Sequence, residues 1–322
     1  MLICKDCLRP FEEYGSEWTR RSGKKDYRCY CGSKHKPVDV TKEELESYKY
    51  GFGYHNLKSN DSKRLLIIAD LHCGNKSGLT PPEWFCNESN KKRRRIQEES
   101  WDWFKGTINE IGFVDVVVAN GDIIDGKGFK SGGTELITSD LFKQIKIAER
   151  CIDEIDFNKI FFTYGTSYHV SSNGDDFEVA LAEKFNTVIK DHLWLDINGC
   201  VFDFKHKVSS SSVFSGRATA LLKEVLWNKE WASTGEAPQA DVFIRSHVHY
   251  LTSVTDYDKY LALSTPALQV ADTKFGGREC IGTVNFGLIL IEIPGNFKNV
   301  NDLNVKVYTK NLESMESKSI II

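Results

Sequence analysis

Short apolar runs alternate with longer amphipathic stretches along most of this 322-residue chain. Runs of about four to eight apolar residues between polar or turn-forming ones are typical of buried strands. They predict strands at 65–69, 114–119, 160–163, 200–204 and 241–245. Apolar residues at helical spacing predict helices over 92–111, 134–155, 176–190 and 217–231. Strands that alternate with helices in this way predict a layered α/β domain.

The two ends of the chain follow other patterns. Beyond about residue 254, short strands are predicted at 260–263, 282–293 and 303–309, with few helices between them. Residues 38–62 are mostly polar, with a short helix predicted near 42–46. We therefore expect three parts, namely a small module at 1–37, a polar linker at 38–62 and a large α/β domain at 63–322.

Composition narrows the class of protein. A hydrophobic content of 41% with 27% charged residues is typical of a globular protein, and a formal charge of -3 argues against wholesale coating of nucleic acid. No apolar run reaches the roughly 18 residues that a membrane span needs, and the first residues lack the pattern of a signal peptide. Nine cysteines without signs of secretion indicate a reducing compartment. We expect a cytoplasmic location and no membrane partner.

Metal-binding side chains follow four of the predicted strands. The motifs are Asp70-Leu71-His72, Gly121-Asp122, Lys205-His206-Lys207 and Ser246-His247-Val248-His249. Carboxylates and imidazoles are accepted by divalent transition metals. Residues two apart on an extended backbone point to the same side, so Asp70 and His72 can hold one ion. In a strand or a tight loop, His247 and His249 also point the same way and can meet one or two ions. Two cations about 3.5 to 4 Å apart can clamp the attacking and leaving oxygens of a phosphate ester and lower the pKa of bound water.

In this order, the motifs resemble those of the calcineurin-like metallophosphoesterases, over residues 63–293. The resemblance implies a four-layer α-β-β-α sandwich and hydrolysis of phosphate esters by a hydroxide that bridges two cations. It also implies the ligand sets: Asp70, His72 and His249 for one metal, His206 and His247 for the other, and Asp122 bridging the two. The metal remains open among manganese, iron and zinc, because mixed Asp/His sites accept all three.

Each of these residues also has a purely structural interpretation. Asp122 can be a turn residue or a helix N-cap, and His206, between two lysines, can be an ordinary exposed residue. His247 and His249 can be plain strand residues. Asp125 is either a turn residue or a partner that orients a ligand. The order of the motifs favours the metal site.

One motif departs from the family. Where Gly-Asn-His is usual, residues 164–169 read YGTSYH. Thr166 stands in the place of the Asn that binds the second metal, and a hydroxyl is a poorer ligand than an amide oxygen. Either the second site is weaker or His169 replaces the missing ligand. We expect His169 in the active site, as a general acid or as a neutral ligand; the alternative is a loop histidine held by Asp175 or Asp176.

Several residues bear on the substrate. Lys127 stands where protein phosphatases of the family usually have Arg, which disfavours a phosphoprotein. Arg217, near a predicted helix start, can bind phosphate or be an ordinary exposed residue. The five cations at 91–95 can guide a polyanion or form a solvated helix end. Trp84 and Phe85 can close over the site or simply pack against the domain.

Four cysteines in two close pairs predict a structural zinc site in the first module. They are Cys4, Cys7, Cys29 and Cys31. The second pair has a one-residue gap instead of two, which makes His35 a possible substitute; four free cysteines are the alternative. Nine cationic and five acidic side chains give residues 1–37 a net charge of +4, with aromatic residues between them. This pattern suits phosphate contact and base stacking, or merely a small core.

We therefore predict a dinuclear metal-dependent phosphoesterase in which Asp122 and His169 act in catalysis. Nucleic-acid phosphodiesters are the favoured substrate, so DNA or RNA is the expected partner and nuclease activity the expected reaction. One alternative is a phosphomonoesterase or nucleotide phosphatase. The other is a nucleic-acid-binding adaptor that keeps the fold and has lost turnover. The sequence does not indicate an oligomeric state.

Overall fold

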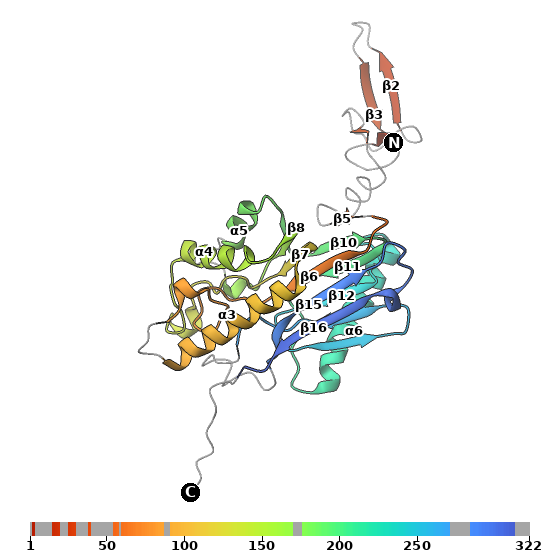
Figure 1. Cartoon of the computed structure of the whole chain (residues 1–322). Coiled ribbons are helices and arrows are strands. Elements are labelled where there is room, and N and C mark those ends of the chain that lie inside the picture. Colours follow the sequence, from red (N-terminus) through yellow and green to blue (C-terminus); the bar gives the residue numbers. More distant parts are fainter. Residues whose placement is uncertain are drawn as a thin grey trace.

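The computed structural model describes residues 59–86, 91–169, 176–270 and 284–312, together with five short strands ahead of them (Figure 1). Two six-stranded sheets make up most of it. The first sheet contains, from edge to edge, β16 (Asn304–Lys310), β15 (Phe286–Ile293), β6 (Lys63–Ile68), β7 (Val114–Asn120), β8 (Phe157–Thr163) and β9 (Ile189–Lys190). The second contains β13 (Thr252–Thr255), β14 (Leu261–Ser264), β12 (Val242–Arg245), β11 (Cys200–Phe204), β10 (Leu193–Ile197) and β5 (Tyr54–Leu57).

Four α-helices belong to the described ranges, so the predicted mixed α/β class is confirmed. They are α3 (Lys91–Ile111), α4 (Leu141–Ile152), α5 (Glu178–Lys184) and α6 (Phe214–Thr234). Single turns of 3-10 helix are η1 (Pro82–Trp84), η3 (Phe129–Ser131), η4 (Ser167–His169) and η5 (Val300–Asp302). None of the described helices combines the length and apolar character that crossing a bilayer requires.

Parallel pairing brings the ends of the predicted strands together. In the first sheet β6, β7 and β8 run parallel, and in the second β11, β12 and β14 do so. Parallel strands end at the same edge of their sheet. The loops after β6, β7 and β8 therefore share one edge, and those after β11 and β12 share another.

Side chains that alternate along β6 enter two different cores. Leu65 and Ile67 pack with Phe202 and Ile244 of the second sheet, so this core lies between the two sheets. Leu66 and Ile68 pack instead with α3 and α4. A third core joins α6 to the second sheet. Burial of each large apolar side chain contributes about 1.5 to 3 kcal/mol, so these three cores hold the strand ends in place.

Two predicted helices were wrong at their ends. The helix predicted at 134–155 begins only at Leu141, because the Asp140 carboxylate caps it by accepting from the Phe142 amide over 3.0 Å. The residues before it are tied to a neighbouring loop, with Ile137 N donating to Gly74 O over 2.7 Å. The segment predicted as helix at 176–190 contains α5 and then the short strand β9. Strands β10 and β13 were not predicted.

The amino-terminal module lies mostly outside the described residues. Its hairpin of β2 (Gly15–Thr19) and β3 (Lys25–Cys29) places Cys29 at a strand end, while Cys4, Cys7 and Cys31 fall outside. The structural zinc site therefore stays a prediction, as do His35 and the boundary at residue 37. Strand β5, inside the predicted linker, pairs in parallel with β10.

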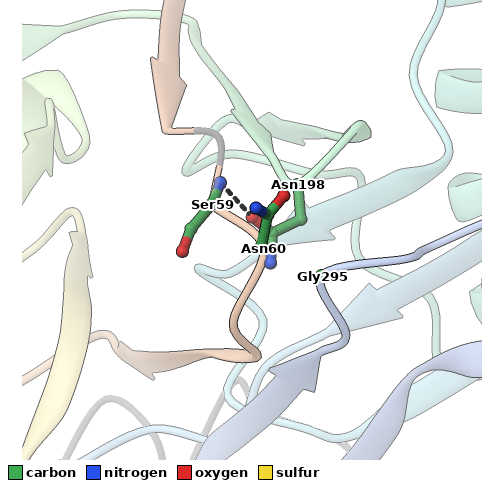
Figure 2. A pocket seen from close by; sticks show the side chains of 4 residues that line it. All are labelled: Ser59, Asn60, Asn198 and Gly295. Atoms are coloured by element: carbon green, nitrogen blue, oxygen red, sulfur yellow. Dashed lines mark hydrogen bonds between the residues drawn. The ribbon is translucent and has the colours of Figure 1, made fainter.

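An open hollow of about 390 Å³ lies where the chain enters β6 (Figure 2). Ser59, Asn60, Asn198 and Gly295 line it, and the Ser59 amide donates to Asn198 Oδ1 over 2.8 Å. The Asn198 amide group also donates to the carbonyl of Asp61 over 2.9 Å. These bonds attach the incoming chain to the β10–β11 turn. The residues that line the hollow include no ionisable side chain.

Candidate metal centre

The structure brings all six predicted ligand residues into two groups of three. Asp70, His72 and His249 form one group and Asp122, His206 and His247 the other; within each, one ligand atom per residue lies within 4.8 Å of the others. The groups adjoin at Asp70. Its Oδ1 lies 3.1 Å from His249 Nε2, and 3.9 Å from both His72 Nε2 and His206 Nε2.

Most of these side chains are oriented by residues in the left-handed backbone conformation and not by an extended strand. Five of the six have positive φ: Asp70 (51°), His72 (45°), Asp122 (50°), His247 (71°) and His249 (55°). The expectation that strand alternation would bring Asp70 and His72 together is therefore wrong, because β6 ends before this pair begins. His247 and His249 lie in a loop after β12, which is one of the two arrangements expected for them. Tight loops, joined by bonds such as Asp70 N to Gly121 O over 3.1 Å, replace it. Non-glycine residues adopt this backbone at a cost and concentrate at functional sites when they do.

Hydrogen bonds fix which nitrogen of two histidines faces the centre. His206 Nδ1 lies 2.7 Å from the Asn120 carbonyl, which can only accept, so Nδ1 carries the proton. His72 Nδ1 lies 2.9 Å from Asp125 Oδ1. The remaining nitrogens, His72 Nε2 and His206 Nε2, are buried and have no hydrogen-bond partner. Although His206 Nε2 lies 3.0 Å from Asp122 Oδ2, the contact is a charge contact without hydrogen-bond alignment.

Unpartnered buried nitrogens that face carboxylates are a good fit for cations. Burial lowers the pKa of His72 and of His247, which favours the neutral, ligating imidazole. For His206 burial acts the same way, but Asp122 and Asp70 outweigh it and raise its pKa to about 10. The Asp122 and Asp70 carboxylates thus stabilise positive charge near His206 Nε2, and a metal cation would supply that charge in place of a proton.

Asp125 orients a predicted ligand instead of merely forming a turn. Its Oδ1 holds His72 Nδ1, and its Oδ2 accepts from Asn75 Nδ2 over 3.1 Å. The carboxylate is 6% exposed, so its two hydrogen bonds fix the His72 ring. Asn75 was missed by sequence reasoning, since an Asn in a loop is usually a turn former.

Thr166 contacts the predicted bridging ligand Asp122. Its amide donates to Asp122 Oδ1 over 2.6 Å, and its hydroxyl lies 3.3 Å from both oxygens of the same carboxylate. Thr166 therefore positions Asp122. Burial would raise the pKa of Asp122, but His169 and His206 hold it well below the usual value.

His169, by contrast, is brought into the cluster. Its Nδ1 lies 2.6 Å from the Asp125 carbonyl and its Nε2 3.5 Å from Asp122 Oδ2, with its ring centroid 4.8 Å from that of His72. Burial lowers the pKa of His169, yet Asp122 and Asp125 outweigh it and the net shift is upward. Of the two acids expected to hold a loop histidine, Asp176 accepts from the Glu178 amide and Asp175 lies outside the described residues.

No protein-family model matches this sequence, and no curated protein sequence matches it. Solved structures with a related arrangement exist. A single mutant of Vps29 from Entamoeba histolytica is 12% identical, with 77% of this chain and 99% of that chain covered and a TM-score of 0.40. A zinc complex of wild-type Vps29 from the same organism is also 12% identical, with 76% of this chain and 98% of that chain covered and a TM-score of 0.39.

Phosphoesterase structures are among the neighbours as well. An archaeal phosphodiesterase is 16% identical, with 77% and 99% of the two chains covered and a TM-score of 0.37. A predicted phosphoesterase from Streptococcus pneumoniae is 12% identical, with 78% and 100% covered and a TM-score of 0.32. At identities and TM-scores this low, the likenesses decide nothing about this chain. The case for its function comes from the geometry of its own side chains.

A second residue that sequence reasoning missed is Glu178, at the start of α5. It is buried and accepts from the amides of Ile123 (2.5 Å) and Gly165 (3.0 Å), which flank Asp122 and Thr166. Burial and the nearby Asp122 carboxylate raise its pKa to about 7. Its place inside an amphipathic helical stretch gave no signal, because an acid in a first helical turn is ordinary.

The structure distinguishes between the alternatives that were left open for several residues near the expected substrate site. In the cationic run, Arg94 and Arg95 pair with Glu98 and Glu99 along α3 (2.8 and 2.6 Å), as a solvated helix end would. Trp84 and Phe85 pack against the core that Leu66 and Ile68 share with α3 and α4, as the packing alternative expects. Arg217 is buried, contrary to the ordinary exposed reading.

Proposed function

We propose that this chain is a dinuclear metal-dependent phosphoesterase of the calcineurin-like type. The observation that carries the proposal is the contact between the two groups at Asp70, where six ligand-type side chains from four loops share one centre. The assigned ligands are Asp70, His72 and His249 for one cation and His206 and His247 for the other, with Asp122 between them. The three separate cores support a four-layer α-β-β-α sandwich as the scaffold.

Divalent cations bound there would neutralise the phosphoryl oxygens and lower the pKa of water. The chain's own residues prepare the centre. Asp125 and the Asn120 carbonyl hold His72 and His206 in the tautomer whose Nε2 is free. Thr166 holds the Asp122 carboxylate through its amide and hydroxyl.

His169 is assigned as the general acid. Its Nδ1 proton is committed to the Asp125 carbonyl, so a proton available for transfer must sit at Nε2, which faces the centre. An upward-shifted pKa keeps that proton in place near neutral pH. It would pass from Nε2 to the departing alcohol oxygen.

Nucleic acid is the proposed substrate, with phosphodiester cleavage as the reaction. Support comes from the net charge of +4 in residues 1–37 and the aromatic residues among those charges. A zinc ion held by Cys4, Cys7, Cys29 and Cys31 would pin that module. Deleting residues 1–37 tests the assignment, because unchanged affinity for single-stranded DNA or RNA would contradict it.

Elemental analysis of wild type beside His206→Ala and Cys29→Ala tests the metal assignment. We expect three metals per chain in wild type, one fewer at the active site in His206→Ala and loss of zinc alone in Cys29→Ala. Turnover of a chromogenic phosphodiester and monoester with added manganese tests the reaction. Two metals at the centre without turnover of either ester would contradict the enzyme.

One observation favours a second candidate, an adaptor that binds nucleic acid without cleaving it. Thr166 bonds to Asp122 and leaves the second group without the amide ligand that the family uses. The adaptor predicts that Asp122→Ala leaves nucleic-acid affinity unchanged and that wild type hydrolyses neither ester. Measured turnover that Asp122→Ala abolishes would exclude it.

A further inference from the structure

Two arginine side chains are buried in the described ranges, and only one of them is neutralised. Arg245 lies 2.8 Å from Asp203 Oδ1 and 3.0 Å from Glu224 Oε2. Arg217 is 8% exposed, yet no described carboxylate lies within 4.0 Å of its guanidinium. Its Nε donates only to the Ser211 carbonyl, over 3.3 Å. Its two terminal nitrogens are not fully buried and have no acceptor among the described residues, so they can bind an anion that is not part of the chain.

Arg217 borders the loops that carry the metal centre. Its guanidinium carbon lies 4.0 Å from the centroid of the Tyr250 ring, and Tyr250 directly follows His249. On its other side, Ser211 belongs to the loop that leaves β11 through His206. Both contacts of Arg217 are therefore made with loops that carry predicted ligands, His249 in one and His206 in the other.

The surroundings add two features that suit a nucleotide. Helix α6 begins after Val213 without a side-chain cap, so its first amides add positive potential near Arg217. The Phe214 ring, centred 5.0 Å from the guanidinium carbon, is 81% exposed. An exposed aromatic ring beside a cation is what base stacking next to a phosphate requires.

We propose that Arg217 binds a second, non-scissile phosphate of a polynucleotide substrate, with Phe214 stacking on the adjoining base. The inference rests on the proposed phosphoesterase function and names a specificity determinant for it. The phosphate supplies the missing counter-charge, and the planar guanidinium offers it two parallel donors.

Binding of a cleavage-resistant dinucleotide tests the proposal without requiring turnover. The full-length protein is titrated with fluorescent dithymidine phosphorothioates that carry a 5′-phosphate, a 3′-phosphate or neither. We expect wild type to bind one phosphorylated form about tenfold more tightly than the unphosphorylated form. Arg217→Met should abolish that preference, whereas Lys223→Met, which removes an exposed cation from the same helix, should keep it.

Further variants separate recognition from folding. Arg217→Lys keeps the positive charge but loses the two parallel donors of the guanidinium, so we expect an intermediate preference. Thermal melting reports whether each variant is folded. Phe214→Ser should weaken binding of all three dinucleotides equally. No preference in wild type, or an equal preference in wild type and Arg217→Met, would overturn the proposal. Hydrolysis of the unmodified dinucleotide is measured separately: its absence alongside a preserved binding preference would refute the proposed activity and leave the role of Arg217 intact.

Discussion

Asn120, at the end of β7, donates a hydrogen bond over 2.7 Å to the hydroxyl of Ser246, which follows β12 in the other sheet. Ser246 Oγ lies 2.8 Å from Thr265 Oγ1, and Thr163 Oγ1 donates to Asn120 Oδ1 over 2.8 Å. All four side chains are buried. Because Asn120 also holds His206 through its carbonyl, this cross-sheet chain of bonds sets how far apart the two sheets stand at the metal centre.

Ser246→Ala should therefore weaken the second group of ligands. It leaves the buried Asn120 amide with only the Lys205 carbonyl, 3.5 Å away, as acceptor, which costs about 1 to 3 kcal/mol in the free energy of unfolding. The visible spectrum of the cobalt-substituted protein should change as well, because His206 and His247 lose a fixed spacing. Ser209→Ala, exposed in the loop after His206, is the control. An unaltered cobalt spectrum in folded Ser246→Ala would contradict a positioning role.

Gly165 lies against Asp122 with no room for a side chain. A Cβ at this position would fall inside the van der Waals distance of Asp122 Oδ1 and of the Asp122 amide. We expect Gly165→Ala to lose a metal at the second group and to destabilise the protein by about 1 to 3 kcal/mol. Gly106→Ala, in α3 with no atom within 4 Å of the added Cβ, should instead stabilise it by about 0.5 to 1 kcal/mol. Metal analysis and urea unfolding measure both effects.

His169→Gln distinguishes a general acid from a metal ligand. Loss of the acid should lower kcat by about 10² to 10⁴ and leave the metal content of the centre unchanged. The effect should be smaller for an ester with a good leaving group, which needs little protonation. His192→Gln is the matched histidine control, since His192 pairs with Asp203 and belongs to neither metal group. A metal content reduced by His169→Gln would make this residue a ligand.

The buried pair of Asp203 and Arg245 predicts how stability depends on pH. Burial would raise the pKa of Asp203, but Arg245 and His192 outweigh it and lower the value to about 2. A lowered pKa stabilises the folded state above the ordinary value of 3.8, and this contribution is lost as pH falls through the folded-state pKa. At pH 5 the wild-type protein should therefore have a larger free energy of unfolding than Asp203→Asn. We expect this difference between the two proteins to decrease by about 2 to 3 kcal/mol from roughly pH 5 to pH 2. Urea titrations across this range measure the difference; a constant gap would contradict the prediction.

Strands were predictable where buried apolar runs are continuous, as in Leu65-Leu66-Ile67-Ile68, which lies within β6. Such a run can be recognised as a buried strand from its amino-acid composition alone. Leu193–Ile197 was not predicted, although its pattern, with Asp196 in fourth place, matches that of Cys200–Phe204, with Asp203 in fourth place. The false helix start at 134 arose because apolar spacing can persist in a loop, whereas the true start depends on the Asp140 cap. Single caps and short interrupted strands depend on tertiary contacts that a local pattern does not contain.

At the candidate site, the residue types and their order were enough to predict which side chains lie together. They did not predict the backbone conformation that orients these side chains. Strand alternation was the wrong reason for the convergence of Asp70 with His72, because the left-handed backbone there arises from contacts with the loop of Gly121 and Asp122. The supporting roles of Ser246 and Asn120 were not predicted, although Ser246 is the first residue of a predicted motif. The signal available was their place, since each is a polar residue at the end of a buried apolar run and directly precedes His247 or Gly121.

The positive φ angles at the ligand positions have a consequence for how this fold would change over generations. Asn tolerates that backbone region better than most side chains, so Asp70→Asn or Asp122→Asn would remove charge from a crowded carboxylate cluster without disturbing the loops. Such replacements would lower the affinity for metal and the hydrolytic activity while increasing the stability of the folded protein. A lineage freed from the need to hydrolyse anything would be expected to drift towards amides at these two places while its sheets stayed intact.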